Sequence, residues 1–309
     1  MRFFFAGLNL RATGAILFCW VGLLAPAQAT ERLFALCGAY PPEMAALRHE
    51  FGVSEKNGFT RTVIKGVEFW RGRSAGQDVI VFRTGTSLVN AAYQLQLALD
   101  HFPITDVLFA GVAGGIDPAL HVGDVVIPER WAYHSEAAYL NEDGKGGYVK
   151  PTYLNIRYPN FGMIFPDDVG VIREGEDKPH DVAAFQTDPA LLEVASRAVK
   201  NVPPMKKAGR NIAVSVGGTG VSGTVFLDNA KYRDWVFQTW KARCLDMEST
   251  GLAHVAYTNG KPFLIVRGLS DLAGGQPGPN PIDDNEARVS EIAARVLRVV
   301  LEELGKPHD

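Results

Sequence analysis

Short apolar runs alternate along the chain with longer segments whose apolar residues recur at three- and four-residue spacing. Runs of the first kind, bounded by glycine or polar residues, predict buried strands at 33–37, 60–64, 67–72, 78–83, 106–111, 122–127, 212–216 and 262–266. Segments of the second kind predict helices with one buried face at 41–51, 88–102, 229–240, 247–258 and 285–304. Because strands alternate with helices, we expect an α/β fold, a single domain whose central mixed β-sheet is flanked by helices.

Two segments interrupt this alternation. Residues 133–186 form a long, aromatic stretch punctuated by glycine and proline, which predicts an insertion over a surface or cleft. Residues 273–281 are rich in glycine and proline and follow Asp271 closely. They are equally typical of a mobile flap and of a plain connector.

Residues 1–29 have the pattern of a secretory signal peptide. Arg2 and Arg11 supply a positive start, residues 15–25 form an apolar core, and Ala27-Gln-Ala29 offers the small residues of a cleavage site. The core is shorter than the roughly 20 residues that span a bilayer, so cleavage before Thr30 is favoured over an uncleaved anchor. We therefore expect the mature chain to be periplasmic or secreted, with no membrane attachment after cleavage.

Composition argues against several partners and chemistries. The chain carries 31 basic and 34 acidic residues, which does not suggest the basic stripe of a nucleic-acid-binding protein. The seven histidines and the cysteines lack zinc-ligand spacing, and no Gly-x-Ser-x-Gly nucleophile motif occurs. Cys37 and Cys244 stand in apolar contexts, which favours buried thiols over a disulfide. We expect neither a metal nor a cofactor.

Two glycine-rich segments have the composition of ligand-binding turns. Residues 218–223 match the dinucleotide-binding pattern Gly-x-Gly-x-x-Gly, but residues 224–228 do not open a clear helix. The match is therefore a weak indication of such a site. Residues 110–115 are predicted to form a glycine-rich turn at a strand end, which serves either ligand approach or tight packing.

Three acidic residues stand where predicted strands give way to helices or loops. Glu43 follows the first strand, Glu248 begins the helix at 247–258, and Asp271 follows the strand at 262–266. Singly, each is more simply explained as a helix cap or a surface charge. Together they favour a binding site, because ligands of open α/β sheets bind at the carboxyl ends of the strands.

An ordered series of short motifs resembles a known family. The motifs are Gly38-Ala-x-x-x-Glu43, Thr84-Gly-Thr-Ser87, Ala110-Gly-x-Ala-Gly-Gly115, Val122-Gly-Asp-Val-Val126, Ser222-Gly-x-x-Phe226, Asp246-Met-Glu248 and Arg267-x-x-Ser-Asp271. On these residues the chain resembles the nucleoside phosphorylase superfamily, and within it the methylthioadenosine/S-adenosylhomocysteine nucleosidases. The resemblance implies a nucleoside phosphorylase-like fold, a homodimer, and hydrolysis of the N-glycosidic bond of a small-molecule purine nucleoside.

The resemblance also implies catalytic roles. Asp271 would protonate N7 of the purine and Ser270 would orient its carboxyl group, while Glu43, helped by Arg267, would position and deprotonate the attacking water. This division suits the chemistry, because cleavage of an N-riboside needs an acid at the base and a general base for water. It also needs a carboxylate near the cationic, oxocarbenium-like sugar.

Four further residues are implied to bind the substrate. Glu248 would hold the ribose hydroxyls, Met247 would lie against the sugar, and Phe226 would stack on the base. Val112 stands beside the water or phosphate position, where the nucleosidases usually have serine, and this difference removes one polar contact.

Other departures from the family pattern leave the nucleoside and the reaction open. The insertion at 133–186 has no counterpart in the compact enzymes and falls near the substrate region, and Tyr40-Pro-Pro replaces the usual Met-Glu-Glu before Glu43. A phosphate-dependent phosphorylase, with Arg83 as a phosphate contact, is the first alternative, although Glu43 suits water activation better. A non-catalytic nucleoside-binding or storage protein is the second.

Overall fold

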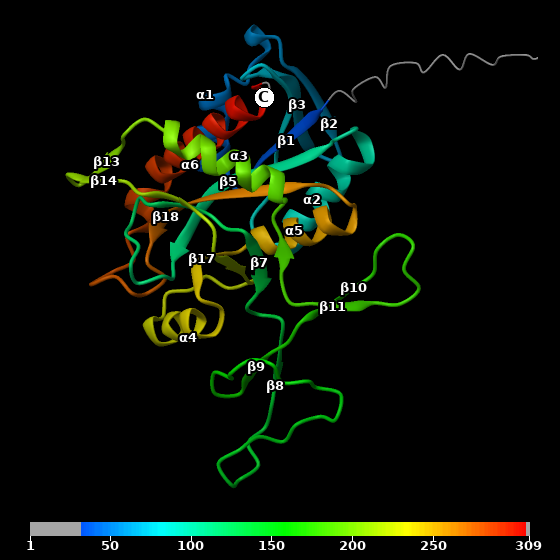
Figure 1. Cartoon of the computed structure of the whole chain (residues 1–309), viewed down its shortest axis with the longest axis vertical. Helices are drawn as coiled ribbons and strands as arrows, with labels where there is room; N and C mark the ends of the chain where they lie inside the picture. Colours follow the sequence, from blue (N-terminus) through cyan, green and yellow to red (C-terminus); the bar gives the residue numbers. More distant parts are fainter. Residues whose placement is uncertain (1–31, 307–309) are drawn as a thin grey trace, which may run out of the picture. The chain divides into compact units, whose positions relative to one another are not determined.

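The computed structural model describes residues 32–306 and joins twelve strands in one mixed sheet (Figure 1). The main path runs β12-β7-β16-β17-β5-β1-β4-β3-β2, and β18, β6 and β15 attach to it through β5. The strands are β1 (Leu33–Gly38), β2 (Thr60–Ile64), β3 (Val67–Ser74), β4 (Gln77–Arg83), β5 (Asp106–Gly115), β6 (Val125–Ile127), β7 (Arg130–Tyr133), β12 (Phe185–Gln186), β15 (Val214–Val216), β16 (Thr219–Ser222), β17 (Ala242–Asp246) and β18 (Phe263–Asp271). This architecture confirms the predicted mixed α/β fold.

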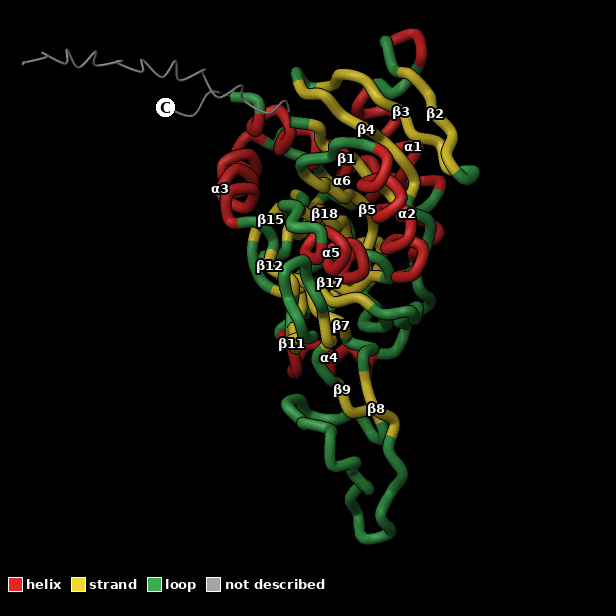
Figure 2. Tube along the Cα trace, turned by 90° about the vertical axis from the view of Figure 1, so that its right-hand side faces the viewer, coloured by secondary structure: helices red, strands yellow, loops and turns green. Residues whose placement is uncertain are grey.

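Helices cover both faces of the sheet (Figure 2). They are α1 (Pro41–Phe51), α2 (Leu88–His101), α3 (Pro189–Ala198), α4 (Ala230–Trp240), α5 (Ser249–Thr258) and α6 (Ile282–Leu304), with 3₁₀ turns at Glu55–Asn57 and Val199–Asn201. One apolar core joins the sheet to α1, α3 and α6, and the other joins it to α2 and α5. Helix α4 packs against β17 in a third, smaller cluster.

Strand β1 shows how the sequence feeds both cores. Its six residues are all buried. Phe34 and Leu36 join the core under α1 and α6, whereas Leu33, Ala35 and Cys37 join the core under α2 and α5. Successive side chains of a strand point to opposite faces, so a continuous apolar run is what a strand covered on both sides requires.

The predicted helices agree with the structure to within a few residues, but the strands differ more. Helix α1 has the predicted bounds, and α5 begins at Ser249 with Glu248 in the capping position. Strands β7, β16 and β17 and helix α3 were not predicted, because they are short or carry little apolar periodicity. Strand β18 continues through Asp271, so this residue ends the strand and does not follow it.

Both predicted glycine-rich turns are wrong, because each lies mostly in a strand. Residues 110–115 belong to β5, where they pair with β18 and β17. Residues 219–222 form β16, which pairs in parallel with β7 and β17. A Cβ atom on Gly220 would overlap the ring of Trp131, so close packing accounts for this glycine.

The insertion leaves the sheet after β7 and returns through β12. These two strands pair antiparallel at its base, with Phe185 opposite Trp131. Between them lie two hairpins, which consist of β8 (Ala137–Tyr139) with β9 (Ile164–Pro166) and β10 (Val169–Val171) with β11 (His180–Val182). Both figures show the part that contains β8 and β9 extending away from the sheet, beyond α4, whereas β10 and β11 lie to the side of the sheet in Figure 1. A further small hairpin joins β13 (Lys206–Lys207) to β14 (Arg210–Asn211).

Three remaining observations concern the sequence predictions. Cys37 and Cys244 are buried free thiols, as expected. The proposed signal segment, 1–29, lies outside the described residues. Within residues 32–306, no helix is long and apolar enough to cross a membrane.

Candidate active site

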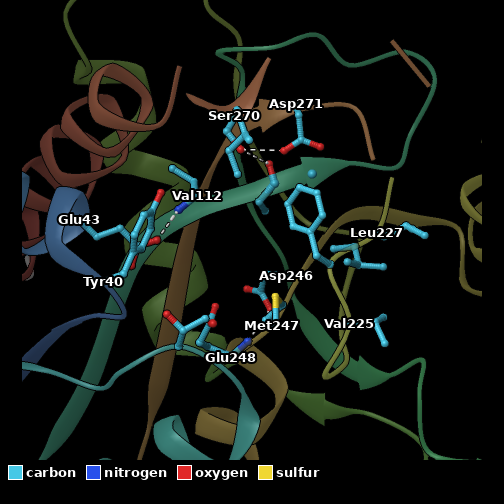
Figure 3. Close-up of a pocket in the computed structure, with 16 residues that line it drawn as sticks. Tyr40, Glu43, Val112, Val225, Leu227, Asp246, Met247, Glu248, Ser270 and Asp271 are labelled. Carbon is cyan, nitrogen blue, oxygen red and sulfur yellow. Dashed lines mark hydrogen bonds between the residues drawn. The ribbon is translucent and has the colours of Figure 1, made fainter. Parts of the chain in front are cut away.

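A cavity lies where β1, β5, β17 and β18 end (Figure 3). Seven of the eight residues singled out from the sequence line it, namely Glu43, Val112, Phe226, Met247, Glu248, Ser270 and Asp271. The eighth, Arg267, is fully buried beneath it. Segments far apart in the sequence therefore meet at one point, as the carboxyl ends of neighbouring strands do in open α/β sheets.

Glu43 is held rigidly in the first turn of α1. Its Oε2 accepts a hydrogen bond from the backbone N–H of Ala39 at 2.5 Å, and its Oε1 accepts one from Val112 at 2.8 Å. A Cβ atom on Gly111 would overlap this carboxylate, so only glycine at this position leaves room for the Glu43 side chain. Burial raises the pKa of Glu43, and Arg267 opposes that shift. A buried carboxylate with a raised pKa is suited to accept a proton near neutral pH.

Arg267 connects the acidic residues of the site. Its Nε lies 2.6 Å from Asp246 Oδ2, its Nη1 lies 3.4 Å from Glu43 Oε1, and its Nη2 lies 3.5 Å from Glu248 Oε2. The guanidinium carbon also lies 4.1 Å from the ring centre of Phe109. One buried cation thus faces three buried carboxylates. A buried charge needs such partners, because desolvation otherwise costs several kcal/mol.

Asp246 is a site residue that the sequence prediction did not use. Its carboxylate accepts hydrogen bonds from the Ser222 hydroxyl at 2.5 Å and from the backbone N–H groups of Glu248 and Ser249 at 3.2 and 3.1 Å. Asp246 therefore binds backbone N–H groups at the start of α5 while it pairs with Arg267. The only signal in the sequence was its position in the motif Asp246-Met-Glu248.

Glu248 faces the cavity from the start of α5. Its Oε1 accepts a 2.8 Å hydrogen bond from the backbone N–H of Ser87, a residue with a φ of 82°. Such a conformation is costly for serine and is typical of a functional position. Burial raises the pKa of Glu248, and the negative charge of Asp246 raises it further.

Asp271 and Ser270 occupy another wall of the cavity. Ser270 Oγ donates to Asp271 Oδ2 at 2.8 Å, and the backbone N–H of Ala273 donates to Oδ1 at 2.8 Å. The Asn280 side chain donates to the same Oδ1 at 3.4 Å. Asn280 lies in the predicted loop at 273–281, so this loop contacts the acid directly. No motif in the sequence identified Asn280.

The wall formed by residues 225–227 is apolar. Phe226 has 56 % of its surface exposed and lines the cavity together with Val225 and Leu227. An exposed aromatic ring beside a cavity offers a flat surface on which a planar base can stack.

Among the described residues, none from 133–186 lines the cavity, although Phe161 of the insertion packs against the apolar cluster that contains Leu227. The expectation that Arg83 contacts a phosphate at this site is wrong, because Arg83 lies in a different hollow, together with Arg48 and Lys65. In the part of the chain that the structure describes, no group of three or more His, Cys, Asp and Glu side chains is arranged to hold a metal ion.

Comparison with known proteins gives consistent results. The sequence pattern of the phosphorylase superfamily matches residues 34–304. A 5′-methylthioadenosine/S-adenosylhomocysteine nucleosidase from Geobacillus kaustophilus is 30 % identical over 245 residues, which are 79 % of this chain and 86 % of the relative. The nucleosidase of the same name from Tolumonas auensis is 28 % identical over 270 residues, or 87 % and 98 % of the two chains.

Solved structures share the fold. The Helicobacter pylori 5′-methylthioadenosine/S-adenosylhomocysteine nucleosidase, crystallised in complex with a substituted pyrrolidin-3-ol, has a TM-score of 0.66 at 20 % identity, covering 88 % of this chain and 98 % of its own. The futalosine hydrolase of Helicobacter pylori has a TM-score of 0.66 at 19 % identity, with the same coverage. The chain therefore belongs to the phosphorylase superfamily and, within it, to the N-ribosyl hydrolases that the methylthioadenosine/S-adenosylhomocysteine nucleosidases represent.

Proposed function

We propose that this protein hydrolyses the N-glycosidic bond of purine nucleosides, with Glu43 as the general base and Asp271 as the general acid. The observation that carries the proposal is that Glu43 and Glu248, both paired with the buried Arg267, line the same cavity as Asp271. Water on Glu43 and a base beside Asp271 would then lie on opposite sides of the sugar.

The reaction step follows from this placement. The oxygen of a water molecule attacks C1′ while Glu43 accepts one of its protons, and the bond from C1′ to N9 breaks. Asp271 donates a proton to N7, so the purine leaves as a neutral base. Ser270 orients the acid through its 2.8 Å hydrogen bond, and general acid–base catalysis of this kind contributes about 10²–10⁴-fold to the rate.

The excess of carboxylates stabilises the transition state. Three carboxylates surround one guanidinium group, so the site is negative when all four groups are ionised. A sugar that develops positive charge at C1′ is attracted to such a site, in which the charges are already oriented. Glu248 would also accept hydrogen bonds from the ribose hydroxyls, with Met247 against the sugar and Phe226 on the base.

Water is favoured over phosphate as the nucleophile. Arg267 is already paired with three carboxylates, and Val112 offers no hydroxyl where an anion would need a hydrogen bond. A phosphate dianion would therefore meet uncompensated negative charge beside Glu43. The names of the relatives suggest methylthioadenosine or S-adenosylhomocysteine as the nucleoside, and that of the futalosine hydrolase names a different substrate for a protein of this fold.

The test is chromatography of the products from a panel of purine nucleosides, with and without phosphate. Free base and ribose in phosphate-free buffer support hydrolysis, and Glu43→Gln should abolish them. Release that requires phosphate and yields ribose 1-phosphate would establish the phosphorylase alternative. Binding without base release over hours would establish a binding or storage protein.

We also propose that the protein is exported and dimeric. The signal pattern at 1–29 supports export, and cell fractionation followed by N-terminal sequencing should find a mature chain that begins at Thr30. The exposed apolar surfaces of Val89 and Tyr93 on α2 support an interface. Light scattering of the purified mature chain should give twice the mass of one chain.

A further inference from the structure

Two hydroxyl side chains, Tyr40 and Thr86, line the cavity at a distance from the base-protonating acid. Tyr40 directly follows Ala39, whose N–H binds Glu43, and Thr86 directly precedes Ser87, whose N–H binds Glu248. Both are therefore tied to the carboxylates that would serve the sugar. Figure 3 shows Tyr40 on the opposite side of the cavity from Asp271.

The hydroxyl proton of Tyr40 already takes part in a hydrogen bond within the protein. Tyr40 Oη donates to Glu286 Oε2 at 3.1 Å, and Glu286 lies one turn of α6 beyond Ile282, which also lines the cavity. Burial raises the pKa of Tyr40 above its usual value, as do the charges of Glu43 and Glu286. The phenol consequently keeps its proton, and its remaining lone pairs can only accept hydrogen bonds.

The negative charges around Tyr40 also favour a ligand group that donates a hydrogen bond over one that only accepts. The negative charges of Glu43 and Glu286 both raise the pKa of the Tyr40 hydroxyl group. Glu248 accepts a hydrogen bond from the backbone N–H of Ser87, the residue that follows Thr86. A hydroxyl proton from a ligand would be attracted to this part of the cavity. A thioether sulfur has no proton to donate and is only a weak acceptor.

The orientation of a bound nucleoside follows from the proposed function. With the base against Phe226 and Asp271, and the 2′- and 3′-hydroxyls on Glu248, the substituent at C5′ points away from the base. Tyr40 lines the cavity on the side opposite Asp271, so its hydroxyl group lies toward that substituent. The group at C5′ therefore decides whether the Tyr40 oxygen finds a hydrogen-bond donor.

We infer that Tyr40, held by Glu286, selects purine nucleosides with a free 5′-hydroxyl over those with a 5′-thioether. The inference rests on the proposed hydrolysis, and it gives this chain a preference opposite to the one that its relatives' names suggest. A site built to hydrogen-bond a hydroxyl discriminates against the analogue that lacks it, because the protein group is then left without its partner. Since Tyr40 is only half-buried, we expect a preference of about 10-fold in kcat/KM, which corresponds to one good hydrogen bond.

The experiment compares kcat/KM for adenosine and for 5′-methylthioadenosine, which share the same base. The wild-type protein should favour adenosine by about 10-fold or more. Tyr40→Phe keeps the ring and removes the hydroxyl, so it should lower this ratio by about 10-fold, mainly through KM. Glu286→Gln should lower it less, because the amide oxygen still accepts the phenol proton. Tyr153→Phe, at a tyrosine 80 % exposed in the insertion, is the matched control and should leave the ratio unchanged.

Several outcomes would overturn the inference. A wild-type preference for 5′-methylthioadenosine would do so, as would a Tyr40→Phe variant with an unchanged ratio. Calorimetry of adenosine and 5′-methylthioadenosine binding to the Glu43→Gln variant measures selection without turnover. It therefore separates a failure of this inference from a failure of the proposed function. Tyr40-dependent binding of adenosine without base release by the wild-type protein would refute hydrolysis and leave the selection standing. Base release with no effect of Tyr40 on the binding ratio would refute the selection alone.

Discussion

Replacement of Arg267 by methionine tests the electrostatic account of the site most directly. Methionine fills much of the same space but removes the cation that faces Glu43, Asp246 and Glu248. Arg267 is fully buried, so solvent cannot replace the lost charge. Removing one partner of a buried ion pair costs about 3–5 kcal/mol, and we expect a loss of unfolding free energy in that range. This is a large fraction of the roughly 5–15 kcal/mol that stabilises a folded domain.

The loss should depend on pH. Arg267 lowers the pKa of both Glu43 and Glu248, so its removal raises those values further in the folded protein. A carboxyl group whose pKa is raised by folding stabilises the protein at low pH, and that contribution is lost as the pH rises through the folded-state pKa. The deficit of Arg267→Met relative to wild type should therefore be greater at about pH 9 than at about pH 6.

Urea unfolding, followed by circular dichroism at both pH values, measures this difference. Arg298→Met is the matched control, because Arg298 lies on the exposed side of α6, where it pairs with Glu302 and donates a hydrogen bond to the backbone carbonyl of Glu50. The unfolding free energy of Arg298→Met should stay within about 1 kcal/mol of the wild-type value at either pH. Arg267→Lys keeps the charge and should recover part of the stability. A deficit for Arg267→Met below about 1 kcal/mol, or one that does not change with pH, would refute the reasoning.

Four further predictions concern activity. Burial raises the pKa of Glu43, so kcat/KM should fall with decreasing pH along a limb centred above 4.5, and a pH profile with its midpoint at or below that value would contradict this. Asp271→Asn should lower kcat by about 10²–10⁴-fold in a base-release assay, and full activity would remove it from the mechanism. Phe226→Ala should raise KM by about 10-fold through lost stacking, with little change in kcat. Replacing residues 142–148, at the tip of the insertion, by two glycines should leave kcat/KM unchanged, because Asn141 and Val149 already close a hairpin there and the insertion does not line the cavity.

The sequence predicted the acidic residues that line the cavity better than it predicted the strands around them. Glu43, Glu248 and Asp271 were found because each stands at the end of an apolar run, where the chain changes from strand to helix or loop. Strands β16 and β17 were missed, since glycine, serine and charged residues obscure their apolar character. Their place in the sheet depends on pairing with β7 and β5, which lie far away in the sequence.

Residues that act through long-range contacts could not be predicted. Asn280 and Glu286 carry no motif, and their importance comes only from the side chains that they reach, Asp271 and Tyr40. Asp246 was visible in a motif, but its pairing with Arg267 and its hydrogen bonds to the start of α5 were not.

The sequence by itself determined the alternation of strands and helices, because burial on both faces of a sheet imposes continuous apolar runs and packing of a helix imposes one apolar face. It also determined which acidic residues stand at the strand ends. Only the tertiary structure decided that three carboxylates converge on one buried guanidinium, that the insertion does not line the cavity, and that the Tyr40 hydroxyl donates its hydrogen bond to Glu286. Local periodicity reports the environment of each segment, whereas charge balance and hydrogen-bond direction depend on which distant segments meet.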